Sequence, residues 1–181
     1  DMAIYDPKDY EKVINRIQEK VNALHINMGA CLSEEAIAAF EACHKVQLPQ
    51  AYRLFLQKVG NGCEHVFNEL ESCPCQELAK PFMLDTFWLW EDDDREEELI
   101  EADMENKVYR GNIELADKGC GMSYHLIITG KCRGEVWNFA DVGVQPCCER
   151  QDFLGWFELW LDEGDEADYF KDYVYDEADF E

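Results

Sequence analysis

The chain has few basic residues and no long apolar run. Its 181 residues include 16 lysines and arginines against 40 aspartates and glutamates, which gives a formal net charge of −24 at pH 7. This charge argues against direct nucleic-acid binding, because phosphate binding requires cationic side chains. No run of about eighteen apolar residues exists, so we expect no membrane-spanning helix. The first twelve residues lack the basic end and apolar run of a secretory signal, and we expect a cytoplasmic protein.

The cysteines form no regular pattern. There are nine, an odd number, and they lack the even spacing of a small secreted scaffold. We therefore expect reduced thiols, several of them buried as small apolar groups, and we predict no metal ion and no cofactor. One alternative stays open, a tetrahedral zinc site made by Cys63, His65, Cys73 and Cys75.

The apolar residues are sufficient for a folded core. The sequence is 47% hydrophobic and 13% aromatic, which argues against global disorder. Its length fits a single domain. We place that domain at residues 1–161, with its core at 33–161, and treat the acidic, tyrosine-rich residues 162–181 as a C-terminal tail.

Two helices are predicted near the start of the chain. Residues 6–25 keep helical spacing of apolar residues, with Asp6 as a cap and Pro7 as a helix starter. A second helix is predicted to begin at Ser33, whose hydroxyl can accept a free backbone N–H.

Residues 48–62, LPQAYRLFLQKVGNG, predict a third helix with clear ends. Pro49 suits the first helical position, where its missing N–H costs nothing. The apolar residues that follow form one stripe at helical spacing. Gly60 and Gly62 are predicted to permit the left-handed exit that stops a helix.

The second half of the chain alternates between aromatic and acidic segments. Residues 82–90 predict a strand, and the acidic residues 91–98 lead into a helix. Residues 123–140 predict a hairpin, and Asp152 is expected to cap a closing aromatic helix. The order predicts a single α+β domain with a mainly antiparallel (mixed) sheet, N-terminal helices and a closing C-terminal helix.

Three segments in this order carry a family resemblance. They are the LP-x-x-Y-x-x-F-L and GNG pattern of residues 48–62, the segments GNIELADKGCG, YHLIITG and GEVW between 111 and 137, and FLGWFELWL at 153–161. Together they resemble the SUKH superfamily, the Smi/Knr cell-wall-assembly-regulator-like proteins. The resemblance implies a binding module without a shared catalytic centre. Bacterial relatives look like immunity proteins that neutralise a toxin, often a nuclease or deaminase, and fungal relatives act in cell-wall regulation through protein partners.

No catalytic residue is predicted. Cys120, between Gly119 and Gly121, invites a nucleophile interpretation with His125 nearby, but no third orienting group is evident. The glycines instead predict a turn that requires positive φ or close backbone approach. The acids of residues 91–98 are too alike to be assigned as an acid–base pair, and the stretch lacks the ligand pattern of an EF-hand loop.

Charge and resemblance together predict a protein that binds a basic, nuclease-type toxin domain. A strong negative field speeds the capture of a basic partner. We place the partner-binding surface, with two tyrosines as aromatic anchors, at Asp92, Asp93, Asp94, Glu96, Glu97, Glu98, Tyr173 and Tyr175. Three other interpretations stay open: acids that serve solubility alone, a regulatory scaffold of the cell-wall-regulator type, and a Cys/His metalloprotein or enzyme. The sequence predicts no particular oligomeric state.

Overall fold

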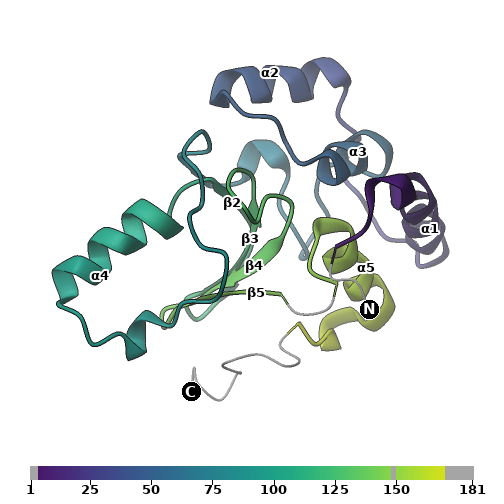
Figure 1. Cartoon of the computed structure of the whole chain (residues 1–181). Helices are drawn as coiled ribbons and strands as arrows, with labels where there is room; N and C mark the ends of the chain where they lie inside the picture. The colour runs from purple at the N-terminus through teal and green to yellow at the C-terminus, as the bar shows by residue number, and fades with distance from the viewer. Residues whose placement is uncertain (1–3, 148–149, 170–181) are drawn as a thin grey trace.

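A five-stranded antiparallel sheet forms the centre of the protein (Figure 1). The computed structural model describes residues 4–147 and 150–169. The strands lie side by side in chain order, each antiparallel to its neighbour. Their bounds are β1 Cys75–Gln76, β2 Asn112–Gly119, β3 Met122–Ile127, β4 Val136–Phe139 and β5 Val144–Pro146. The hairpin predicted at 123–140 is formed by β3 and β4.

Helices lie on both sides of this sheet. Figure 1 shows α4 on one side and α1, α3 and α5 on the other, with α2 next to α3. The α-helices of the described residues are α1 Tyr10–Ala23, α2 Glu34–His44, α3 Gln50–Lys58, α4 Glu97–Asp103 and α5 Phe153–Glu163. A π-helical turn, Met104–Val108, continues α4, and short 3-10 turns lie at Pro7–Asp9, Leu70–Ser72, Trp90–Asp92 and Gly164–Glu166. The predicted α+β class is confirmed.

The sheet separates two apolar cores, because successive strand residues point to opposite faces. The larger core joins the sheet to α1, α3 and α5 and includes Ile17, Phe55, Leu115, Leu126 and Phe157. The smaller core, on the side of α4, consists of Phe82, Trp90, Val108, Ile127, Cys132, Trp137, Phe139 and Val144.

Side-chain caps explain where α2, α5 and the 3-10 turn that precedes α1 begin. The Asp6 carboxylate accepts the Lys8 N–H at 3.0 Å. The Ser33 hydroxyl accepts the Ala36 N–H at 3.1 Å. The buried Asp152 carboxylate accepts the Gly155 N–H at 2.7 Å. Each side chain satisfies a backbone N–H that has no partner within its helix, so all three predicted caps are confirmed.

The third helix is present, but its flanking residues act differently from the prediction. Pro49 is the N-cap and not the first helical residue. Gly62 has φ +96°, but it lies three residues after the C-cap Val59, and Gly60, which follows the C-cap directly, does not have positive φ. A Cβ at Gly60 would stand 2.6 Å from the carbonyl oxygen of Gly29. Gly60 is therefore needed for a close crossing of two loops and not for helix termination.

The strand predicted over residues 82–90 is wrong. Only two isolated bridges form there, from Phe82 to Gly130 and from Trp88 to Val144. Between them the chain leaves the sheet, and the aromatic side chains of Phe82 and Trp90 pack on its face in the smaller core. We call residues 82–96 the arm.

The helix α1 and Tyr169 both contact α5. Glu158 on α5 is buried and binds Arg16 and Lys20 of α1, at 2.6 and 3.1 Å. Tyr169, within the predicted tail, is also buried, and its ring lies 5.2 Å from the ring of Tyr124 in β3. The domain boundary at residue 161 stays a prediction, and the described residues beyond it include a side chain of the larger core.

Candidate protein-interaction surface

Two tryptophans fix the arm, Trp88 to the last strand and Trp90 to the loop before it. The backbone N–H of Trp88 donates to the carbonyl of Val144 at 3.0 Å, and the reverse bond measures 2.9 Å. The indole N–H of Trp90 donates to the carbonyl of Asp141 at 2.6 Å. These bonds hold the start of the acidic segment against the sheet, so its position is determined by the core.

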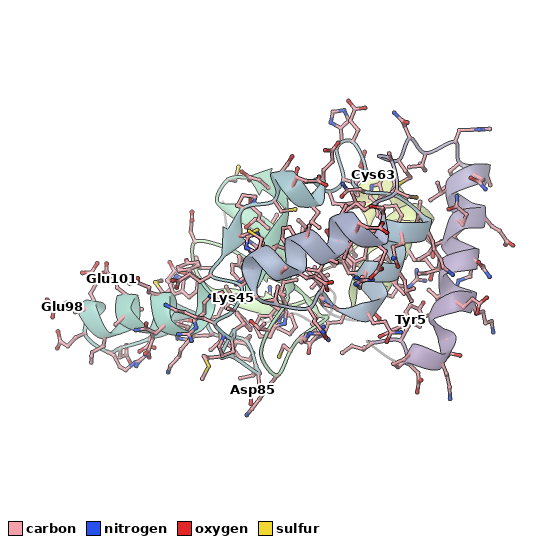
Figure 2. The ribbon with its side chains drawn as sticks, turned by 90° about the horizontal axis from the view of Figure 1, so that it is seen from above. Tyr5, Lys45, Cys63, Asp85, Glu98 and Glu101 are labelled. Carbon is pink, nitrogen blue, oxygen red and sulfur yellow. The ribbon has the colours of Figure 1, made fainter. Side chains whose placement is uncertain are left out.

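Five of the six predicted acidic residues are exposed. Asp92, Asp94 and Glu96 belong to the last part of the arm, while Glu97 and Glu98 form the first turn of α4. Acidic side chains stabilise this end of a helix, where the backbone N–H groups carry partial positive charge. In Figure 2, Glu98 and Glu101 lie at the outer edge of the molecule, on α4. The structure therefore places these five acids in one continuous exposed segment, the end of the arm and the start of α4.

Asp93 differs from its neighbours because its carboxylate is used internally. It accepts hydrogen bonds from the Arg95 guanidinium at 2.9 Å and from the indole N–H of Trp88 at 3.1 Å. Hydrogen bonds from the Arg95 side chain and backbone lower the pKa of Asp93 to about 2. Asp93 thus orders the arm, whereas the other five predicted acids are exposed.

Most acids of this region have no cationic partner among the described residues. Both basic residues between 85 and 107 are engaged: Arg95 binds Asp93 and Asp103, and Lys107 binds Asp103 at 3.2 Å. No described residue forms an ion pair with Glu91, Asp92, Asp94, Glu96, Glu97, Glu98, Glu101 or Glu105. Their charge is uncompensated locally and produces a negative field around α4.

A hollow of about 460 Å³ lies between the arm and α4. Its walls combine apolar and charged side chains: Met83, Leu84, Asp85, Thr86, Phe87, Trp88, Arg95, Asp103 and Lys107. We call it the arm groove. The sequence analysis did not predict this groove, although one signal was present. Ile100, Met104 and Val108 recur every four residues and predict the buried face of a helix, so the apolar Leu99, outside that spacing, is left off the buried face.

A second hollow, of about 590 Å³, lies beside the loops that follow α1 and α3. Gly29, Gly62 and Cys63 line it, together with Asp117 and Lys118 at the end of β2. Burial raises the pKa of the Cys63 thiol to about 11, so this sulfur is protonated at neutral pH and a poor nucleophile. Cys63 therefore gives this hollow no activated nucleophile.

The Cys120 and His125 pair is not arranged for catalysis. Cys120 occupies the β2–β3 turn with φ +55°, and the glycines on both sides also have positive φ, which confirms the predicted turn. His125 is buried, with Nδ1 2.8 Å from Oδ1 of Asn112 and Nε2 2.8 Å from Oγ of Ser123. Burial lowers its pKa to about 3, so the ring is neutral and both nitrogens are occupied. His125 therefore orders the sheet.

The four candidate zinc ligands do not assemble. The Cys73 thiol donates to the carbonyl of Glu69, and the Cys75 thiol donates to the carbonyl of Cys73, each at 3.3 Å. The His65 side chain is exposed and lies near Glu64. Within residues 4–147 and 150–169, no group of three or more His, Cys, Asp or Glu side chains is placed to hold a metal ion.

The two predicted aromatic anchors, Tyr173 and Tyr175, lie outside the described residues. Across the part of the chain that the structure describes, no helix has the length and apolar character needed to cross a membrane.

The sequence of residues 31–174 matches the SMI1 / KNR4 family (SUKH-1). The chain belongs to this family. The match covers the three motif segments, the arm and α4, and it extends past residue 161. It leaves out α1, which nevertheless contributes to the larger core of this SUKH-1 protein. Domains of this family generally bind protein partners. Neither a curated protein nor a solved structure matches the chain significantly.

Proposed function

We propose that this SUKH-1 protein is a non-catalytic, cytoplasmic immunity protein that neutralises a basic, nuclease-type toxin by binding it through the acidic surface of the arm and α4. The observation that carries the proposal is the set of eight acids around α4 that have no ion-pair partner among the described residues. Family membership supports a protein partner.

The physical argument concerns complementary charge. A nuclease carries cationic side chains in its phosphate-binding cleft, because it must neutralise phosphates. A surface such as that of α4 would attract this cleft over several ångströms and accelerate association. Bound there, the acids would occupy the place of the phosphates and block access of nucleic acid.

The test uses the product of the reading frame beside the gene for this chain. We expect it to be basic, toxic when expressed alone, bound by this protein, and harmless when the two are co-expressed. A neighbouring product that is neither toxic nor bound would overturn the immunity role. Binding without toxicity would favour the alternative, a regulatory scaffold.

A charge-reversed variant locates the surface. The variant Asp92→Lys, Asp94→Lys, Glu97→Lys spares Asp93, which orders the arm. At low ionic strength its association rate should fall by about tenfold or more. The matched control reverses the exposed acids Glu11, Glu19 and Glu35 and changes the net charge equally. Equal effects of the two variants would show that net charge, and not this surface, controls capture.

A further inference from the structure

Exposed apolar side chains gather at the arm groove. Met83 and Leu99 are each 55% exposed, and Phe87 is 43% exposed. Met83 and Phe87 line the groove directly. Leu99 precedes Asp103, another lining residue, by four positions on α4, so it lies on the same helix face. Large apolar side chains clustered on a surface are typical of interaction sites.

Three of the four charged side chains that line the groove, Arg95, Asp103 and Lys107, are paired with one another. Arg95 binds Asp103 at 2.8 Å, and its guanidinium lies 5.9 Å from the centre of the Trp88 ring. Lys107 forms an ion pair with the same Asp103 carboxylate. These side chains need no polar group from a ligand, so a side chain that enters the groove gains most by being apolar.

The groove is also held in shape by the backbone. The N–H of Met83 donates to the carbonyl of Lys107 at 2.8 Å, which ties the arm to the segment after α4. The pairing of Trp88 with Val144 fixes the other wall to the sheet. A groove that is formed before binding costs less conformational entropy when a ligand enters.

Charge determines which occupant fits. The groove lies beside eight acids without ion-pair partners among the described residues. A second copy of this chain would bring a net charge of −24 to the same place, and nucleic acid or an anionic membrane would also be repelled. A cationic protein segment is attracted.

We propose that the arm groove is the anchor site of the acidic surface and takes one apolar side chain, flanked by lysines or arginines, from a cationic segment of the partner. The inference rests on the proposed function, because it names the partner chemistry of the same surface. In such an interface the buried apolar anchor slows dissociation, whereas the surrounding charges mainly set the association rate.

The probes are two synthetic peptides, acetyl-Lys-Lys-Gly-Phe-Gly-Lys-Lys-amide and the same peptide with serine in place of phenylalanine. Binding to the full chain is followed by amide chemical shifts in NMR titrations. The phenylalanine peptide should bind about tenfold more tightly than the serine peptide. The affinities of both peptides should fall by the same factor as the salt concentration is raised.

Two variants test the location. Phe87→Ser with Met83→Ser should abolish the difference between the peptides and leave the affinity for the serine peptide unchanged. The matched control is Leu24→Ser, an exposed apolar residue just after α1, which should change nothing. Because these side chains are exposed, circular dichroism should show an unchanged fold.

The outcomes separate this inference from the proposed function. If both peptides bind wild-type protein equally, the anchor site is wrong while capture by the acidic surface stands. If neither peptide binds, the electrostatic basis of the proposed function fails as well. Concentration-dependent dimerisation in sedimentation experiments, lost in the Phe87 and Met83 double variant, would identify a second copy as the occupant and overturn the proposal.

Discussion

Replacing Glu158 by glutamine should destabilise the protein strongly at neutral pH and much less in acid. The carboxylate is 3% exposed, whereas Arg16 and Lys20 are 37% and 32% exposed. Burial alone would raise the pKa of Glu158, but hydrogen bonds from Arg16, Lys20 and Tyr5 outweigh it and lower the pKa to about 2. The variant keeps the side-chain size and removes the charge.

The magnitude follows from linkage between protonation and folding. A pKa that falls on folding from about 4.5 to about 2 corresponds to ~3 kcal/mol of folding free energy. This stabilisation is present above the unfolded pKa and is lost as the pH falls from about 4.5 to about 2. Because Arg16 and Lys20 are partly hydrated, we expect the variant to lose about 2–3 kcal/mol at pH 7.

The assay is urea unfolding of both proteins at pH 7, 5, 4 and 3.5. The difference in the free energy of unfolding between wild type and Glu158→Gln should shrink as the pH falls. Because both proteins share the same general charge repulsion, its change with pH cancels in this difference. Glu19→Gln, at an exposed position of α1, is the matched control and should stay within about 0.5 kcal/mol of wild type. A difference that is constant with pH would refute the linkage argument.

Two further predictions concern His125 and Gly29. Burial lowers the pKa of His125 to about 3, so its ring resonances in NMR should not titrate between pH 8 and 5; a transition near pH 6.5 would contradict this assignment. A Cβ at Gly29 would stand 2.0 Å from the carbonyl oxygen of Asn61, so Gly29→Ala should cost about 2–4 kcal/mol in urea unfolding. Gly119→Ala, where a Cβ meets nothing within 4 Å but φ is +77°, should cost only about 1–2 kcal/mol, and equal costs at the two sites would argue against the steric explanation.

Features determined by neighbouring residues were predictable from the sequence. The caps at Asp6, Ser33 and Asp152 were identified correctly because each depends on a side chain and an N–H two or three residues away. The turn at Cys120 was predictable for the same reason, since its glycines provide positive φ.

Features that depend on distant segments were not predictable. The aromatic run of the arm has strand composition, but the side chains of Phe82 and Trp90 pack on one face of the sheet, and the segment does not extend the sheet. Gly60 has no room for a side chain because the backbone of Gly29, about thirty positions earlier in the sequence, passes close to it. Asp93 is indistinguishable from Asp92 and Asp94 in sequence, and only the placement of Trp88 and Arg95 separates their roles.

Because one sheet separates the two cores, substitutions on its two faces are expected to affect stability independently. Side chains of α1, α3 and α5 meet one face of the sheet, whereas the arm and the segment after α4 meet the other. Substitutions of a residue on α1, α3 or α5 and of a residue in the arm lie on opposite faces of the sheet, so their effects on stability should add. The side that we propose for recognition can therefore accept substitutions in the arm while the packing of α1, α3 and α5 on the other face of the sheet is kept.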